Sequence, residues 1–257
     1  MKLLCFTSAK GGSGTSLAVA CLAYALKALG KKCLAADLHG GCRTLDLYMG
    51  TDGDFVFDLY DVLCGNCSFE DAVVHGGAVC DFVSSSQSVA YTREDYPGVI
   101  GILQNACSEY DYVLLDCPAD FATDDAVCRC DGIVLVTGCD KASVRCAEKL
   151  VSDMPADTDK KLIINNIVPE LIYGGHHTNV DDICDLCGVP PLGLIPYAPS
   201  AAFAANAAQL MEDNSLPLSQ AFANTAQRLE GNSVAAVSFD RKTYYSKLIK
   251  KYSRRKV

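Results

Sequence analysis

The sequence comprises 257 residues, of which 50% are hydrophobic and 21% are charged. This balance is typical of a globular protein and excludes a chain that is disordered throughout. The formal net charge is −9 at pH 7. A chain of this charge is not expected to coat nucleic acid with its whole surface, because phosphate backbones require clustered lysine and arginine.

The charge is distributed unevenly along the chain. Residues 238–257 contain eight of the 22 basic residues and one acid, Asp240, so this segment carries a charge of +7. The preceding 237 residues contain 14 basic and 30 acidic residues and carry −16. We therefore expect a globular domain over residues 1–237 and a basic tail over residues 238–257.

The fifteen cysteines are not expected to form a disulfide framework. Their number is odd, the chain is long, and the sequence shows neither a secretory signal nor an apolar run of about 18 residues. Several lie inside apolar stretches, among them Cys21, Cys33, Cys117 and Cys139. These features predict a protein of the reducing cytoplasm without a transmembrane helix.

Short apolar runs alternate with amphipathic segments along most of the chain. The apolar runs predict strands over residues 2–7, 32–37, 79–84, 111–116, 132–137, 161–166 and 191–196. The amphipathic segments predict helices over about residues 15–30, 56–63, 68–74, 96–109, 122–129, 141–153, 179–187, 199–210 and 217–229. The strand at 132–137 is apolar on both faces, which is typical of a sheet covered by helices on both sides. The pattern therefore predicts a doubly wound α/β fold with a mostly parallel sheet.

A glycine-rich segment follows the first predicted strand and precedes the first predicted helix. It reads Ser8-Ala9-Lys10-Gly11-Gly12-Ser13-Gly14-Thr15-Ser16. Such a turn directs several backbone N–H groups and the positive end of the helix dipole toward one point, which favours phosphate binding. Ser16 stands where a hydroxyl group binds Mg²⁺ in loops of this kind. We interpret Gly11, Gly12 and Gly14 as the residues that shape the cradle.

This loop differs from the ordinary phosphate-binding loop at one position. Thr15 replaces the lysine that contacts the β- and γ-phosphates, and another lysine, Lys10, stands at the start of the loop. The arrangement resembles the deviant Walker A family that includes MinD and ParA, and Thr15 resembles a departure found in its TadZ/CpaE-like branch. The resemblance implies a P-loop NTPase fold that binds ATP and Mg²⁺ through Lys10, Gly11, Gly12, Ser13, Gly14, Thr15 and Ser16. It also implies a homodimer, in which Lys10 has a catalytic position at the nucleotide of the partner subunit.

The resemblance extends to residues 34–50, which span the second predicted strand and the segment after it. Asp37 matches an aspartate that lies near the Mg²⁺ ion in the family. His39 stands where a second aspartate orients the water that attacks the γ-phosphate, so the resemblance implies a catalytic position for it. The alternative is that His39 is an exposed loop residue without a role.

Later segments extend the resemblance to about residues 1–230. The segment Leu114-Leu115-Asp116-Cys117-Pro118-Ala119 resembles the Walker B and switch II region. It implies that Asp116 holds Mg²⁺, whereas the alternative is a carboxylate that only caps the end of a strand. Asp120 replaces the usual glycine of this region. The resemblance also implies that Asn165 contacts adenine and that Pro196 packs against the base.

The two substitutions bear on catalysis, because phosphoryl transfer depends on positioning and electrostatic stabilisation. With Thr15 in place of the lysine, a fixed positive charge beside the phosphates is missing. One nitrogen of His39 offers less to an attacking water than the two oxygens of a carboxylate. We therefore expect ATP binding with slow or absent hydrolysis, in a protein that marks a site for division, segregation or pilus assembly. One alternative is a fully cycling membrane-associated ATPase.

A second alternative is an iron–sulfur carrier, since such carriers share the deviant loop and use cysteine ligands. Two Cys-x-x-Cys pairs are present, Cys64 with Cys67 and Cys184 with Cys187. They lie far apart in the sequence, and the second pair falls on a predicted helix, so this spacing disfavours a shared metal site.

The basic tail has the pattern of an amphipathic helix. Within residues 240–256, one side holds Tyr244, Tyr245, Leu248, Ile249 and Tyr252, and the other holds Lys247, Lys250, Lys251 and Arg254. A basic amphipathic helix with aromatic residues is typical of a membrane-surface element, and the resemblance to MinD implies one at this position. We therefore expect a peripheral location at the inner face of the cell membrane. The alternatives are packing on the acidic domain, contact with a partner protein, or contact with nucleic acid, which the sequence favours less.

Overall fold

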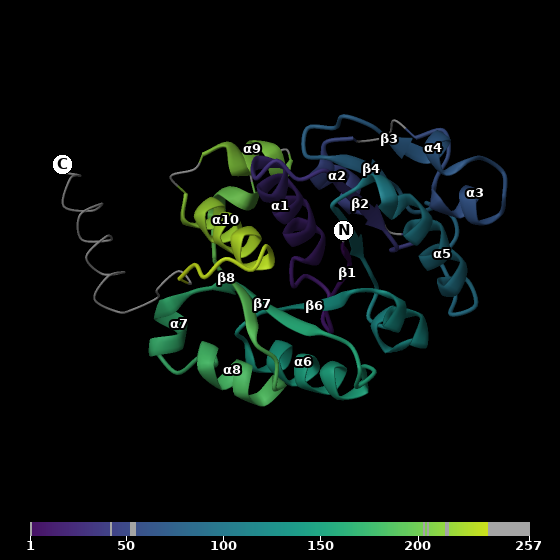
Figure 1. The fold of residues 1–257 in the computed structure, drawn as a ribbon. Coiled ribbons are helices and arrows are strands. Elements are labelled where there is room, and N and C mark those ends of the chain that lie inside the picture. The colour runs from purple at the N-terminus through teal and green to yellow at the C-terminus, as the bar shows by residue number, and fades with distance from the viewer. Residues whose placement is uncertain are drawn as a thin grey trace.

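The computed structural model describes residues 2–41, 43–51, 55–202, 204, 206–213 and 216–235. The predicted basic tail and its membrane contact at residues 240–256 lie outside these residues. The helix-forming and strand-forming parts of the predicted domain fall almost entirely within them (Figure 1).

The centre of the molecule is an eight-stranded sheet with the order β3-β4-β2-β5-β1-β6-β7-β8. The strands are β1 (Lys2–Thr7), β2 (Cys33–Asp37), β3 (Val73–Val74), β4 (Asp81–Val83), β5 (Tyr112–Asp116), β6 (Gly132–Thr137), β7 (Lys160–Ile167) and β8 (Pro191–Pro196). Every pairing is parallel except that of β3 with β4. This confirms the predicted doubly wound, mostly parallel sheet.

The strands are connected mainly through helices. The α-helices are α1 (Thr15–Ala28), α2 (Leu45–Met49), α3 (Leu59–Leu63), α4 (Phe69–Ala72), α5 (Tyr96–Ala106), α6 (Lys141–Asp153), α7 (Pro169–Tyr173), α8 (Val180–Cys187), α9 (Ala207–Glu212) and α10 (Pro217–Leu229). The 3-10 helices are η1 (Cys107–Glu109), η2 (Phe121–Thr123), η3 (Asp125–Arg129) and η4 (Pro199–Ala202).

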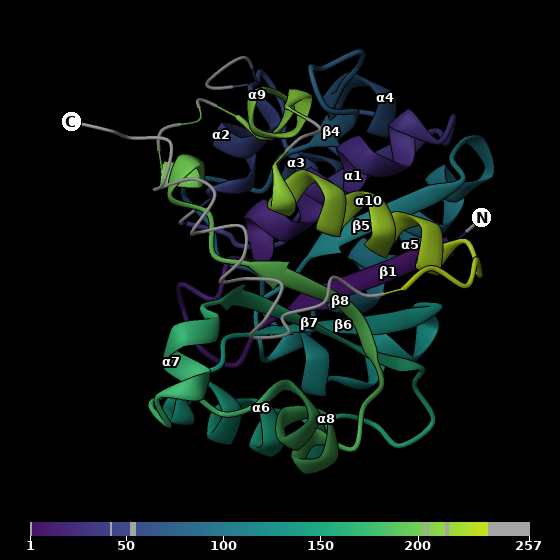
Figure 2. The same cartoon turned by 90° about the vertical axis from the view of Figure 1, so that its left-hand side faces the viewer.

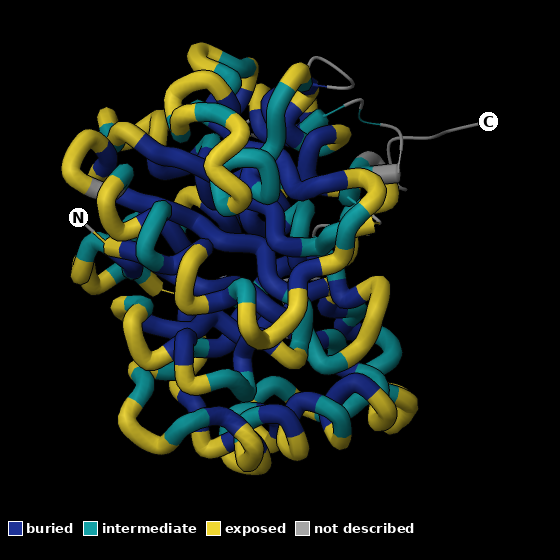
Figure 3. Tube along the Cα trace, turned by 90° about the vertical axis from the view of Figure 1, so that its right-hand side faces the viewer, coloured by how far each residue is buried: buried dark blue, intermediate teal, exposed yellow. Residues whose placement is uncertain are grey.

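Helices cover both faces of the sheet, and each face has its own hydrophobic core (Figures 1 and 2). On one face α1, α2, α9 and α10 pack together, and on the other lie α5, α6 and α8. Strand β6 illustrates the reason, because Ile133 joins one core and its neighbour Val134 joins the other. Alternate side chains of a strand point to opposite faces, so a strand that is apolar throughout requires cover on both. Figure 3 accordingly shows buried segments running through the middle of the molecule.

All seven predicted strands are present, whereas several predicted helices differ in extent. The predicted helix at 68–74 ends at Ala72, because Val73 and Val74 form the edge strand β3. The predicted helix at 122–129 is replaced by the 3-10 helices η2 and η3, and that at 199–210 is divided into η4 and α9. The short helices α2 and α7 were not predicted, because five residues contain too few turns for a periodic pattern.

The sheet order brings three strand ends to one place. Strand β5 lies between β1 and β2, and its last residue, Asp116, is in register with Phe6 on one side and Asp37 on the other. In open parallel sheets, ligands bind at the carboxyl ends of the strands, where the chain leaves in different directions. This edge also holds the glycine-rich segment that follows β1.

Candidate phosphate and cation site

The glycine-rich loop, residues 8–14, connects the end of β1 to the start of α1. Gly12 and Gly14 have φ angles of 81° and 87°, a region that side chains with a Cβ atom rarely adopt. Asn165, at 5% exposure, donates a hydrogen bond from Nδ2 to the Ser13 carbonyl oxygen at 2.8 Å. A Cβ atom on Gly14 would lie 2.5 Å from that same Nδ2 atom. Gly14 is therefore required both by its backbone angle and by the close approach of Asn165.

The start of α1 has the properties of an anion site. No side chain caps the helix at Gly14, and no acidic residue lies in its first turn. The Thr15 side chain is buried, and its hydroxyl oxygen has no hydrogen-bond partner among the described residues. The first N–H groups of a helix lack partners within the helix, and its dipole favours negative charge there. The loop and the first turn of α1 thus have features that suit phosphate, and phosphate binding by these residues stays a prediction.

Lys10 is held by the start of helix α6. Its ammonium group lies 3.1 Å from Oδ1 of Asp140 and 3.3 Å from Oγ of Ser143. Asp140 caps α6 by accepting a hydrogen bond from the Ser143 backbone N–H at 3.0 Å. Burial opposes the change, but hydrogen bonds from Ser143 and Lys10 lower the pKa of Asp140 to about 2. The predicted catalytic lysine is therefore paired with a carboxylate of its own subunit.

A cavity of about 130 Å³ lies against this side of the loop. It is lined by Lys10, Gly11, Gly12, Ser13, Gly138, Cys139, Asp140, Ser143, Asn166 and His177. A larger cavity of about 700 Å³ lies between α4, β3 and the end of α5, and none of the predicted site residues lines it. The smaller cavity thus gathers the phosphate-loop residues, although it is not the most spacious part of the surface.

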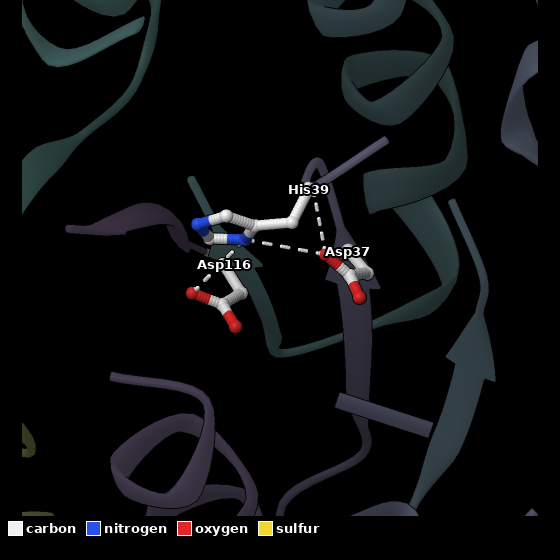
Figure 4. Close-up of side chains that lie close together, drawn as sticks. All are labelled: Asp37, His39 and Asp116. Atoms are coloured by element: carbon white, nitrogen blue, oxygen red, sulfur yellow. Dashed lines mark hydrogen bonds and ion pairs between the residues drawn. The ribbon is translucent and has the colours of Figure 1, made fainter. Parts of the chain in front are cut away.

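Two carboxylates and an imidazole meet at the ends of β2 and β5 (Figure 4). Asp37 and Asp116 are both 0% exposed. Nδ1 of His39 lies 3.4 Å from Oδ1 of Asp37 and 3.7 Å from Oδ1 of Asp116. The ring of His39 faces both carboxylates, 35% of its side chain is exposed, and its catalytic position stays a prediction.

Burial and mutual charge set the protonation of this group. Burial raises the pKa of Asp116 to about 7, with His39 opposing the rise and Asp37 adding to it. Burial alone would lower the pKa of His39, but the carboxylates of Asp37 and Asp116 outweigh it and raise that pKa. Without a cation, the site therefore favours bound protons that compensate its negative charge.

The chemistry of the donors fits a divalent cation. Both carboxylate oxygens of Asp116 and Oδ2 of Asp37 are buried without a hydrogen-bond partner among the described residues. Unpaired buried acceptors of this kind are costly, and a bound cation satisfies them. Ser16, on the first turn of α1, lies with its hydroxyl 3.1 Å from that of Thr44. Ser16, Asp37 and Asp116 are the residues that would hold Mg²⁺.

Some features of the site were not evident in the sequence. Asp140, Thr44 and His177 were not predicted, because their proximity to the loop depends on how α6 and the segments after β2 and α7 pack.

Three residues named in the sequence analysis have the following places. Asn165 supports the loop through its hydrogen bond to Ser13, and its contact with adenine stays a prediction. Pro196 lies at the end of β8, and its packing against the base also stays a prediction. Asp120 accepts a hydrogen bond at 2.7 Å from the hydroxyl of Tyr96.

Replacement of Gly14 by alanine tests the close approach of Asn165. We expect Gly14→Ala to lower the free energy of unfolding by about 2–4 kcal/mol, because the left-handed backbone angle costs about 1–2 kcal/mol and the displaced Asn165 loses a buried hydrogen bond. Gly30→Ala is the matched control, since Gly30 has a φ angle of 78° but no atom within 4 Å of the added Cβ. Chemical denaturation measures both variants. If Gly14→Ala and Gly30→Ala lose the same free energy of unfolding, the role assigned to Asn165 is contradicted.

The buried carboxylate predicts a dependence of stability on pH. Because the folded-state pKa of Asp116 is raised to about 7, its ionisation is penalised in the folded protein, and stability is lost as the pH rises from about 4 through 7. We measure the free energy of unfolding without nucleotide and with a chelator. As the pH rises from 5 to 8, we expect the free energy of unfolding of Asp116→Asn to increase by about 2–3 kcal/mol relative to that of the wild type. Denaturation at several pH values measures this gain. Substitution of the exposed Glu94 by glutamine should produce none, and parallel curves for Asp116→Asn and the wild type would refute the prediction.

Comparison with known proteins agrees with this geometry. A family model described as an AAA domain matches residues 1–162. The septum site-determining protein MinD of Synechocystis sp. is 29% identical over 246 residues, which cover 93% of this chain and 92% of that protein. A chain of the MinC:MinD cell division protein complex of Aquifex aeolicus is 30% identical, with a TM-score of 0.80 over 91% of this chain and 98% of its own.

A further solved structure shares the fold. It is MinD of Pyrococcus horikoshii complexed with Mg-ADP, which is 23% identical and has a TM-score of 0.73 over 89% of this chain and 96% of its own. The family match covers more than half of the sequence, and the similarity to the Aquifex chain covers nearly all of it. The chain therefore belongs to the MinD/ParA family of P-loop ATPases.

Proposed function

We propose that this protein binds ATP with a divalent cation, forms a homodimer in that state, and marks a position at the inner face of the cell membrane. The observation that carries the proposal is the proximity of two features at one sheet edge. These are the uncapped start of α1 behind its glycine loop and the buried, unpaired carboxylates of Asp37 and Asp116. The first feature suits phosphate, and the second suits the cation that accompanies it.

The nucleotide would lie along the loop. Backbone N–H groups from Gly11 to Ser16 and the Thr15 hydroxyl would contact its phosphates, with Ser16, Asp37 and Asp116 at the cation. A protein of the same fold, that of Pyrococcus horikoshii, is complexed with Mg-ADP, which supports a nucleotide and Mg²⁺ as the ligands. When bound, the cation supplies positive charge to the phosphates. This charge matters because position 15 holds a threonine and not the usual lysine.

Slow hydrolysis is part of the proposal, and the surroundings of His39 support it. The neighbouring carboxylates raise the pKa of His39, although its burial acts in the opposite direction. Nδ1 of His39 lies 3.4 Å from Oδ1 of Asp37 and 3.7 Å from Oδ1 of Asp116, so this nitrogen faces the two carboxylates. One imidazole nitrogen already directed at carboxylates offers less to an attacking water than the two oxygens of the aspartate that the family resemblance places there, and Thr15 removes a phosphate contact as well.

Dimerisation and partner binding would use the loop side of the molecule. The Lys10 side chain is 45% exposed, and its ion pair with Asp140 is also partly exposed, so exchange for a phosphate of a second subunit costs little. The Aquifex MinC:MinD complex supports a protein partner for the assembled dimer. We propose that this partner is a protein that binds the nucleotide-bound dimer.

The membrane element is assigned to residues 240–256 on the basis of the sequence. Within the part of the chain that the structure describes, no helix combines the length and apolarity needed to cross a bilayer. Each basic residue of the tail near an anionic leaflet contributes about 1 kcal/mol, so one tail binds weakly. Two tails held in one dimer bind by avidity, and this links membrane binding to nucleotide binding.

Calorimetry and a turnover assay test the nucleotide part of the proposal. We expect ATP to bind, the dimer to form with ATP in sedimentation velocity, and turnover to be at least about 10-fold slower than that of Synechocystis MinD assayed in parallel, since general base catalysis contributes about 10²–10⁴-fold. His39→Asp should raise turnover, whereas His75→Ala, which alters a histidine outside the site, should not. No binding at millimolar ATP would overturn the nucleotide site. Fast turnover that His39→Ala abolishes would overturn slow hydrolysis alone.

Co-sedimentation with liposomes tests the membrane part. The full chain with ATP should pellet with anionic vesicles, and a chain that lacks residues 240–257 should stay in the supernatant, because the basic and aromatic side chains are then missing. Two controls separate the contribution of charge to membrane binding from that of apolar contact. Neutral vesicles remove the charge of the lipid, and the triple change of Lys247, Lys250 and Lys251 to glutamine removes charge from the tail. Equal pelleting of the full and shortened chains would exclude the tail as the membrane element.

A further inference from the structure

The cation side of the site contains a nitrogen donor. Among the described residues, Asp37, His39 and Asp116 form the one group of three potential metal ligands whose donor atoms all lie within 4.8 Å of one another. A site made of carboxylates and a serine hydroxyl would be all oxygen, which is the set that Mg²⁺ prefers. An imidazole in the same position changes the class of metal that the site selects.

Four potential metal-donor atoms of this group are buried without a hydrogen bond of normal geometry in the described part of the chain. They are both oxygens of Asp116, Oδ2 of Asp37 and Nδ1 of His39, and Nδ1 lies within ion-pair distance of both carboxylates. The two aspartates are 0% exposed, so water does not satisfy these atoms from the surface. Buried polar atoms are nearly always paired in folded proteins, and a set of unpaired donors that face one another points to a ligand between them.

The spacing of the donors fits direct binding to one ion. Two ligand atoms about 2.1 Å from a metal, at tetrahedral angles, lie about 3.4 Å apart. Nδ1 of His39 is 3.4 Å from Oδ1 of Asp37 and 3.7 Å from Oδ1 of Asp116. Figure 4 shows that this nitrogen faces both carboxylates. These two separations are close to those expected for ligand atoms of one ion, and all three donor atoms lie within 4.8 Å of one another.

The backbone holds the three residues in place. Asp37 and Asp116 are in register on the neighbouring strands β2 and β5. The backbone N–H of His39 donates to Oδ1 of Asp37 at 2.7 Å, which fixes the histidine relative to the first aspartate. A ligand set that is positioned before the metal binds loses little entropy on binding.

We propose that Asp37, His39 and Asp116 directly bind a first-row transition-metal dication in preference to Mg²⁺. This inference deepens the proposed function, because it concerns the cation of the same site. Imidazole nitrogen suits metals such as Zn²⁺, Co²⁺ and Fe²⁺, whereas Mg²⁺ takes oxygen ligands and gives up its water reluctantly. The metal would join the ends of β2 and β5 whether or not a nucleotide occupies the loop.

Titration with Co²⁺ in the absence of nucleotide tests the proposal, because Co²⁺ is visible by its absorption. We expect one equivalent to bind to the full-length protein and a 100-fold excess of Mg²⁺ not to displace it. His39→Ala should lower the Co²⁺ affinity at least about 100-fold, since even changes to groups that only orient metal ligands cost about 10- to 100-fold. His39→Asp should reduce the preference for Co²⁺ over Mg²⁺ at least 10-fold.

Matched controls separate this site from the other metal-binding groups of the chain. His75→Ala removes a histidine whose Nδ1 lies 3.0 Å from a carboxylate oxygen of Asp81, and it should leave Co²⁺ binding unchanged. Cysteine ligation would reveal itself by a thiolate-to-cobalt charge-transfer band, which we expect to be absent for the first equivalent. Thermal unfolding checks that each variant is folded.

Specific results would overturn the inference. They are unchanged Co²⁺ affinity in folded His39→Ala, displacement by equimolar Mg²⁺, or a first equivalent bound to thiolates. These outcomes are distinguishable from failure of the proposed function, because nucleotide binding is measured separately by calorimetry with Mg²⁺ present. A protein that binds ATP but shows no dependence of Co²⁺ affinity on position 39 refutes the metal preference alone.

Discussion

Asp37 and Asp116 lie side by side at the ends of β2 and β5, and both carboxylates are buried. Two like charges in this position are expensive unless protons, a cation or a neighbouring positive group compensates them. Much of the site follows from this requirement. Burial raises the pKa of Asp116 to about 7, and the carboxylates raise the pKa of His39 against the effect of its own burial. The protein thus carries a cost in stability at the place where we propose that a cation binds.

The sheet order creates this pair of carboxylates and connects it to the phosphate loop. Because β5 is inserted between β1 and β2, Asp116 is adjacent both to the strand that leads into the loop and to the strand that ends in Asp37. Asn165, from β7, supports the loop through the Ser13 carbonyl group, and Asp140, at the start of α6, holds Lys10. Residues from five separate parts of the chain therefore converge on one sheet edge, and no local segment forms the site alone.

The sequence predicted those parts that depend on local pattern. Strand β6 was identified because it is apolar on both faces, and the loop was identified because glycines follow a strand and precede a helix. The pairing of Lys10 with Asp140 was not predicted, because 130 residues separate them and only the packing of α6 brings them together. The orientation of His39 was left open for the same reason, since its ring direction depends on β5, a strand distant in sequence. Short elements such as α2 and β3 were missed because tertiary contacts, and not periodicity, define them.

His39 connects the two unusual properties proposed for this protein. An aspartate at this position would add a third negative charge beside Asp37 and Asp116, and that set would favour a hard cation with oxygen ligands. A histidine adds no negative charge, and it offers a nitrogen to a metal or holds a proton between the carboxylates. Its Nδ1 faces the two carboxylates, so this nitrogen is poorly directed for accepting a proton from water. The proposed metal preference thus depends on His39 alone, whereas the proposed slow hydrolysis depends on His39 and on the absence of a lysine at position 15.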